Sequence, residues 1–134
     1  AYRFINGEIM PPEMRKYYTL VKEPLNIEKM QEALKLLEGE HDFLAFRSSG
    51  GMNLSTVRTI YSAVLKEEGE GYRIEVTGNG FLYNMIRIIA GTLMDVSEGR
   101  ISPDDIPVIL EAKDRLKAGR TAMAHGLYLN KVYY

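Results

Sequence analysis

The chain has 134 residues with 17 basic and 18 acidic side chains, which gives a net charge of −1 when the histidines are neutral. This length can bury one hydrophobic core, and the absence of cysteine excludes disulfides, thiolate catalysis and cysteine-ligated metals within the sequence. His41 and His125 are the only histidines, which excludes a site with three histidine ligands, and the near-neutral charge argues against a generic DNA-coating protein while permitting a local basic patch.

No apolar run approaches the roughly 20 residues that cross a membrane, and the first residues do not have the pattern of a signal peptide. We therefore expect one cytoplasmic domain over residues 1–134, with no membrane partner. The sequence opens on a strand-like segment without an initiator methionine, so we expect it to begin inside an element of a longer protein.

The N-terminal part is expected to contain a strand, an irregular segment and a helix. Tyr2 to Ile5 are β-formers followed by the turn dipeptide Asn6-Gly7, and three prolines disfavour a long helix over residues 8–25. Asn26 is a suitable N-cap for a helix whose apolar side chains share one face and which Gly39 would close.

A flexible loop, a hairpin and a very apolar helix are expected next. The loop is the Ser/Gly stretch at 48–51, and residues 56–66 have the composition of a strand. Residues 72–78 alternate apolar and polar side chains, which predicts a half-buried strand paired with 56–66. Residues 80–97 form the strongest helical pattern in the sequence.

The C-terminal part is expected to add one helix and one strand. Ser102 and the acids after it are typical of a helix start, and we expect that helix to reach about Lys117 with a kink at Pro107. Residues 126–134 are rich in β-formers. Together the elements predict an α+β fold, an antiparallel sheet with helices packed on one face.

Arg87 is the only charged residue between Phe81 and Met94, on a helix whose apolar side chains cover well over half of its circumference. Such a helix must be mostly buried, and an unpaired desolvated cation is costly. Asn84 and Gly91 share the narrow polar side, where Gly91 leaves room for a close-packed strand or a ligand. Two interpretations stay open: Arg87 reaches solvent or an internal acid, or it binds a functional carboxylate or an anion.

Other polar groups also have a structural and a functional interpretation. Arg58 in the expected strand and Arg47 before the Ser/Gly loop are either solvated cations or contacts to phosphate. The basic residues of 113–120 either complement a helix C-terminus or bind phosphate. His41-Asp42 lacks the nucleophile motif that a proton-transfer pair would accompany, and Gly78-Asn79-Gly80 is typical of a turn with Asn79 as a cap.

Several blocks of the sequence resemble the tRNA pseudouridine synthase A (TruA) family, in the order and spacing of that family. They are MQEALKLLEGEHDFLAFR at 30–47, FLYNMIRIIAGTLMDV at 81–96, AKDR at 112–115 and TAMAHGLYL at 121–129. Tyr2-Arg3-Phe4 resembles the family's Tyr-Arg-Tyr strand. Met123 stands where the family usually has proline, which concerns only the local backbone before Ala124.

The resemblance implies half of a pseudouridine synthase fold. Members of the family carry their catalytic aspartate in an Arg-Thr-Asp-Ala-Gly-Val-His-like motif, in an N-terminal half that precedes the Tyr-Arg-Tyr strand. That motif is absent from this sequence. The chain therefore resembles the C-terminal half, which we expect to be inactive alone. The full-length enzyme would isomerise uridine to pseudouridine in the anticodon arm of tRNA as a cytoplasmic homodimer without metal or cofactor. The alternative is a stand-alone RNA-binding or protein-interaction module.

The resemblance also implies roles for five side chains. Arg87 matches the arginine that pairs with the catalytic aspartate, and Tyr2 matches the active-site tyrosine that packs against the target uracil. Leu127 aligns with the apolar residue that lines the base pocket. Arg58 and Arg47 match positions on the same cleft, where they would contact RNA phosphates.

Overall fold

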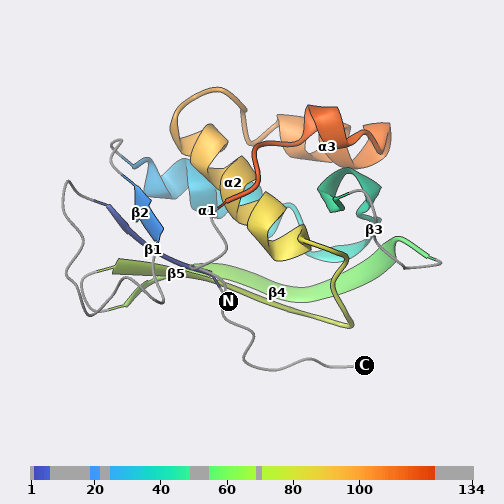
Figure 1. Ribbon diagram of the computed structural model, residues 1–134, viewed down its shortest axis with the longest axis horizontal. Helices are drawn as coiled ribbons and strands as arrows, with labels where there is room; N and C mark the ends of the chain where they lie inside the picture. Colours follow the sequence, from blue (N-terminus) through green and yellow to red (C-terminus); the bar gives the residue numbers. More distant parts are fainter. Residues whose placement is uncertain (1, 7–18, 22–24, 49–54, 69–70, 123–134) are drawn as a thin grey trace.

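The computed structural model describes residues 2–6, 19–21, 25–48, 55–68 and 71–122, and within these ranges five strands form one sheet in the order β2-β1-β5-β4-β3. The strands are β1 (Tyr2–Asn6), β2 (Thr19–Val21), β3 (Gly39–Asp42), β4 (Val57–Glu68) and β5 (Gly71–Gly78). The helices α1 (Ile27–Lys35), α2 (Met85–Ser97) and α3 (Asp105–Ala112) lie on one face of the sheet, with the 3-10 helices η2 (Leu44–Phe46) and η3 (Arg115–Lys117) beside them (Figure 1). This arrangement confirms the predicted α+β fold.

The central hairpin has the predicted pairing. β4 and β5 run antiparallel, with Glu68 opposite Gly71 at one end and Ile60 opposite Gly78 at the other. The alternation of apolar and polar residues in β5 explains why Ile74 and Val76 are buried against the helices. β1 adds to β5 antiparallel, with Tyr2 opposite Ile74.

Two short strands were not predicted. Residues 19–21 pair parallel with β1, so an irregular path over 8–25 is wrong for this stretch, and the sheet is mixed at this edge. Residues 39–42 pair antiparallel with β4. The expected helix closure at Gly39 is also wrong, because α1 ends at Lys35 and Gly39, with φ of +103°, begins β3. Asn26 is confirmed as the N-cap, since its side-chain oxygen accepts a hydrogen bond from the Lys29 N–H at 3.2 Å.

The helix α2 begins five residues later than the apolar pattern suggests. Gly80 has φ of +146° and Asn84 has φ of +60°, and neither backbone conformation continues a right-handed helix. Asn79 does not cap α2, because its side-chain oxygen accepts from the Thr59 N–H at 2.9 Å and its own N–H donates to the Thr59 carbonyl. The residues between β5 and α2 therefore form a fixed connection, which matters for the site described below.

The helix α3 is shorter than expected and is not followed by further α-helix. Its N-cap residue is Asp104, whose N–H donates to the Ser102 hydroxyl at 3.3 Å, and the Ser102 N–H donates to the Asp105 carboxylate at 2.9 Å. Pro107 lies in the first turn, where its missing N–H removes no hydrogen bond within the helix. The helix ends at Ala112, because the next residue, Lys113, has a φ of +55° that leaves the helical region, and η3 follows.

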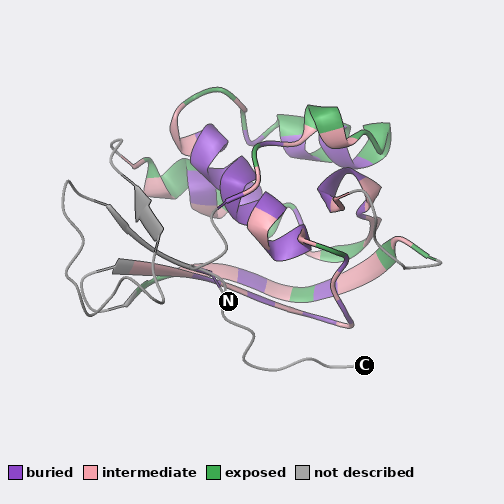
Figure 2. Cartoon of the chain, in the orientation of Figure 1, coloured by how far each residue is buried: buried purple, intermediate pink, exposed green. Residues whose placement is uncertain are grey.

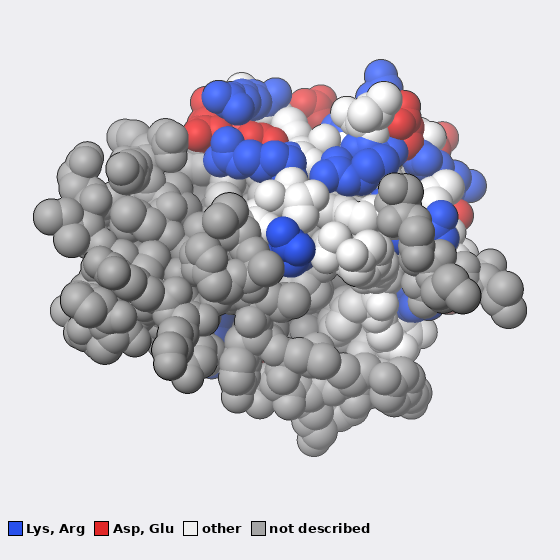
Figure 3. Space-filling model, viewed as in Figure 1, with Lys and Arg blue, Asp and Glu red and all other residues white. Residues whose placement is uncertain are grey.

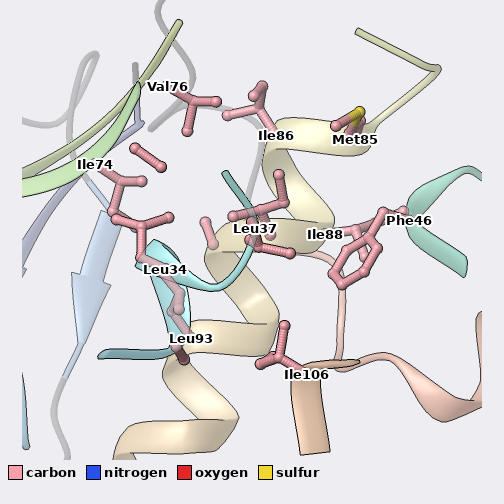
Figure 4. Close-up of a cluster of buried hydrophobic side chains, with 14 of the residues drawn as sticks. Leu34, Leu37, Phe46, Ile74, Val76, Met85, Ile86, Ile88, Leu93 and Ile106 are labelled. Atoms are coloured by element: carbon pink, nitrogen blue, oxygen red, sulfur yellow. The ribbon is translucent and has the colours of Figure 1, made fainter. Parts of the chain in front are cut away.

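The core lies between the sheet and α2. Every residue from Met85 to Val96 is buried except Arg87, which confirms the predicted burial of this helix (Figure 2). Val76 of β5 and Ile86 of α2 point toward each other, and Phe46 of η2 lies beside Ile88 (Figure 4).

None of the described helices is long and apolar enough to cross a membrane. The strand expected at 126–134, Leu127 within it, and most of the Ser/Gly loop lie outside the described residues.

Candidate functional site

Arg87 projects from the first turn of α2, and its donors have two acceptors in the described part of the chain. Its Nε donates to the carbonyl of Ala122 at 2.8 Å, and Nη1 donates to the side-chain oxygen of Asn84 at 3.3 Å. The Ala122 N–H in turn donates to the backbone carbonyl of Arg87 at 3.0 Å. A guanidinium has five N–H donors, so one on Nη1 and both on Nη2 stay available to a further acceptor.

Asn84 connects Arg87 to the segment that carries Arg47. The left-handed backbone of Asn84 turns its side chain so that the oxygen accepts from Arg87 while the amide Nδ2 donates to the Ser48 hydroxyl at 3.1 Å. The Ser48 N–H also donates to the Tyr83 carbonyl at 3.1 Å. Arg47, half-buried, directly precedes Ser48. The start of α2 and the end of η2 are thus joined by hydrogen bonds of both backbone and side chain.

Arg58 lies at the opposite end of the same connection. Its Nη1 donates to the carbonyls of Ser55 at 2.9 Å and Val57 at 2.7 Å. A Cβ on Gly80 would lie 3.4 Å from the Nε of Arg58, so the arginine side chain runs across this glycine. Asn79 is bonded to Thr59, next to Arg58, and Asn84 is bonded to Ser48, next to Arg47. The connection over 79–84 therefore has Arg58 near its first residue and Arg47 near its last.

The electrostatics of this site favour an anion. In the described ranges no carboxylate forms an ion pair with Arg47, Arg58 or Arg87, although Asp and Glu side chains do pair with other cations of the chain. The N-terminus of α2 adds the positive end of a helix dipole beside Arg87. Charged side chains seen on the face in Figure 3 gather over the helices, with basic and acidic groups intermixed. Within the described residues, no three acidic or histidine side chains converge as metal ligands would.

Residues 119–122, which we call the strap, run along α2 and carry the carbonyl that binds Arg87. A Cβ on Gly91 would lie 1.7 Å from the carbonyl oxygen of Arg120, so only glycine permits this approach. The Gly119 N–H donates to the Thr92 hydroxyl at 3.0 Å, and the Arg120 N–H donates to the Asp95 carboxylate at 3.1 Å. The room that Gly91 leaves is therefore occupied by the backbone of the strap, which belongs to no strand, so neither the strand nor the ligand that the sequence allowed lies there among the described residues.

The other predicted site residues are distributed differently. Tyr2 is fully buried in β1 opposite Ile74, and Leu127 lies outside the described residues. His41 and Asp42 do not form a pair: His41 Nε2 lies 2.8 Å from the Glu38 carbonyl oxygen, while Asp42 accepts from the Thr56 hydroxyl at 2.6 Å.

The basic stretch at 113–120 has mainly structural contacts. Arg115 donates to the Gly119 carbonyl at 2.8 Å and to the Thr121 hydroxyl at 3.0 Å. Arg120 Nη1 lies 3.5 Å from Asp95 and 3.2 Å from Glu98, so this arginine is neutralised at the end of α2. Lys113 Nζ lies 3.9 Å from Asp42.

Sequence reasoning placed Asn84 on the same side of the helix as Arg87 without giving it a role, and it missed Thr92. The spacing of three residues between Asn84 and Arg87, on the one polar side of an apolar helix, is the signal that could have identified the first. Thr92 gives no such signal, because its partner is the backbone N–H of Gly119, 27 residues away.

Comparison with known proteins places these residues in a family. A model of the family described as tRNA pseudouridine synthase matches residues 33–134. The tRNA pseudouridine synthase A of Thermoanaerobacter sp. (strain X514) is 47% identical over 133 residues, which are 99% of this chain and 54% of that protein. The protein of the same name from Bacillus subtilis (strain 168) is 48% identical over 132 residues, 98% of this chain and 53% of that protein. That from Ruminiclostridium cellulolyticum is 52% identical over 136 residues, 99% and 56% respectively. The chain spans about half the length of these curated relatives.

Proposed function

Since the chain belongs to the tRNA pseudouridine synthase family, we propose that it forms part of an enzyme that isomerises uridine to pseudouridine in the anticodon arm of tRNA. In this proposal residues 1–134 are one domain, the C-terminal half, and contribute Arg87 to the active site. The catalytic aspartate comes from an N-terminal half. The observation that carries the proposal is the guanidinium of Arg87, oriented by Ala122 and Asn84 with donors left over and with no carboxylate partner among the described residues.

The orientation of Arg87 suits a carboxylate that arrives from another segment. With Nε bound to Ala122, the edge formed by Nη1 and Nη2 keeps three N–H donors for an incoming group. Two parallel N–H donors match the two oxygens of a carboxylate, which Lys cannot reproduce. A cation within hydrogen-bonding distance of a carboxylate favours the ionised form of that carboxylate and fixes its orientation.

The chemistry requires an ionised, aimed aspartate. The C1′–N1 bond of uridine breaks, the base turns, and a new bond joins C1′ to C5, while the proton that C5 loses is balanced by one that N1 gains. The aspartate acts as nucleophile or as base toward the sugar. Arg87 stabilises the aspartate carboxylate during these steps. The detached uracil must be retained, which is the role proposed for Tyr2 by stacking and for Leu127 by an apolar floor that excludes water.

Tyr2 needs a rearrangement to meet a base. Its side chain is fully buried here, so a uracil could contact it only after the atoms that cover it move.

Arg47 and Arg58, at the two ends of the 79–84 connection, are proposed to contact RNA phosphates. Homodimerisation, a cytoplasmic location and the lack of a metal or cofactor stay predictions from the family resemblance.

Kinetics of the full-length protein test the role of Arg87. Arg87→Ala should lower turnover by about 100-fold or more, the size expected when a positioned charged donor is lost, and should leave tRNA affinity within a few-fold. Arg87→Lys should also be poor. Arg58→Ala is the matched control, because losing a phosphate contact should weaken tRNA binding more than turnover. Equal losses of turnover and affinity in Arg87→Ala would make Arg87 a phosphate contact.

The isolated chain provides a second test. Incubated with uridine-containing tRNA, it should form no pseudouridine, while the full-length protein should. Pseudouridine formed by the chain alone would contradict the assignment of the catalytic aspartate to another segment. A full-length protein that binds tRNA in a gel-shift assay but never forms pseudouridine would favour the alternative, an RNA-binding module without catalysis.

A further inference from the structure

The strap makes a continuous set of contacts with one side of α2. From one end to the other, Arg120 N–H meets Asp95, Gly119 N–H meets Thr92, and Ala122 exchanges two hydrogen bonds with Arg87. The partners on α2 run from Arg87 to Asp95, which is about two turns at roughly 3.6 residues per turn. The strap that carries the Ala122 carbonyl is therefore held by contacts about one and a half turns (Thr92) and two turns (Asp95) away from Arg87.

Thr92 is central to this arrangement. Its side chain is 1% exposed, and its hydroxyl donates to the Ile88 carbonyl at 2.7 Å while accepting the Gly119 N–H at 3.0 Å. Gly119 is buried, so without this hydroxyl its N–H would lack an acceptor in a dry environment. A Cβ on Gly119 would lie 2.6 Å from the Cα of Thr92, which shows how closely the two segments approach.

Arg115 holds the strap from its other side. Its Nη1 donates to the Gly119 carbonyl, whose N–H is bound by Thr92, so both backbone groups of Gly119 are paired. Its Nη2 donates to the Thr121 hydroxyl, next to Ala122. Within the described residues no carboxylate pairs with Arg115, and its two contacts both go to the strap.

We propose that Thr92 is a positioning residue for the isomerisation, acting through the strap to fix the Ala122 carbonyl and thereby the guanidinium of Arg87. This inference rests on the proposed role of Arg87. Loss of the Thr92 hydroxyl leaves the Gly119 N–H without its acceptor, lets the strap shift, and turns the guanidinium away from the aspartate. A misplacement of about 1 Å in such a group can cost up to about 100-fold in rate.

The test compares Thr92→Val with Thr92→Ser in the full-length protein. Valine keeps the shape and removes the hydroxyl, whereas serine keeps the hydroxyl. We expect Thr92→Val to lower turnover about 10- to 100-fold with tRNA affinity within two-fold of the native protein, and Thr92→Ser to restore turnover to within about three-fold. In parallel, the ¹⁵N-detected Nε–H of Arg87, assigned with Arg87→Lys, should exchange faster with solvent in Thr92→Val only.

The outcomes separate this inference from the proposed function. If Arg87→Ala leaves turnover intact, the proposed role of Arg87 fails. If Arg87→Ala abolishes turnover while Thr92→Val leaves turnover and Nε–H exchange unchanged, the positioning role of Thr92 is wrong. An equal loss in Thr92→Val and Thr92→Ser would also overturn it, because the hydroxyl would then not be the cause.

If Thr92→Val prevents folding, a variant of the half-buried Arg115 replaces it. Arg115→Ala removes both outer contacts to the strap, and we expect the same drop in turnover and the same faster exchange of the Arg87 Nε–H. Lys117→Ala is the matched control, because it removes a basic charge from the same 3-10 helix at an exposed position. If Arg115→Ala and Lys117→Ala behave alike, the strap does not position Arg87.

Discussion

Gly91→Ala is the sharpest test of the fit between the strap and α2. The added Cβ would lie 1.7 Å from the Arg120 carbonyl oxygen and 2.6 Å from its carbonyl carbon, and real Cβ atoms essentially never approach other atoms below 3.0 Å. Both contacts are backbone, so a side-chain rotation cannot relieve them. The strap must therefore retreat from α2 by more than about 1 Å.

The expected size of the effect follows from the bonds that this retreat breaks. Four hydrogen bonds join the strap to α2, at 2.8 to 3.1 Å, and each contributes on the order of 1 kcal/mol, with a larger cost for the buried Gly119 N–H. Alanine offsets about 1 kcal/mol of this loss, because glycine is a poor helix former. We expect the free energy of unfolding to fall by about 2–4 kcal/mol.

Urea unfolding of the chain measures this difference. Gly99→Ala is the control: Gly99 has φ of +83° and no atom within 4 Å of its would-be Cβ, so only backbone strain of about 1–2 kcal/mol is expected. Helix propensity alone predicts that Gly91→Ala stabilises the chain, which is the opposite sign. A Gly91→Ala chain as stable as the native one would refute the close contact of the strap with α2.

Three further predictions concern positions away from the strap. Asn26→Ala should lower the free energy of unfolding by about 1 kcal/mol in a urea titration, because α1 loses its N-cap bond to Lys29; an unchanged midpoint would contradict the cap. Asn84→Ala should be about 1–2 kcal/mol less stable than Asn84→Gly, since both lose the side-chain bonds but only alanine is strained at φ of +60°, and equal stabilities would refute that strain. The pKa of Glu38 is lowered from its ordinary value of 4.5, first by the Ala63 N–H and then by Lys35, so its stabilising effect exists above that value and is lost as the pH falls through the lowered pKa. The stability difference between the native chain and Glu38→Gln should therefore shrink in acid, and a constant difference in urea titrations across that range would contradict the assignment.

Much of the fold follows from local patterns in the sequence. The alternation in β5, the N-cap Asn26 and the apolar run of α2 each specify their element because the signal lies within a few residues. β2 and β3 escaped prediction because three or four residues are too short to show a period, and their existence depends on the strands that they join. The start of α2 was misjudged because apolar residues continue through a connection whose path is set by the backbone of Gly80 and Asn84.

The candidate site was predicted in part for the same reason. The helical pattern indicated that Arg87 needs a counter-group and that Gly91 leaves room beside it. Among the described residues its acceptors are the carbonyl of Ala122, 35 residues away, and the side-chain oxygen of Asn84, and none is an acid. Periodicity carries no information about such a distant contact. The family resemblance, by contrast, selects Arg87 without saying what orients it.

The two hydrogen bonds between Arg87 and Ala122 have a consequence for association. The backbone carbonyl of Arg87 binds the Ala122 N–H, and the Arg87 side chain returns to the Ala122 carbonyl, so the side chain closes a ring with its own backbone. The torsions of a free arginine carry up to about 2 kcal/mol of rotamer entropy, and here most of that freedom is lost during folding. A carboxylate that later meets this guanidinium finds it already rigid, so less ordering opposes the encounter.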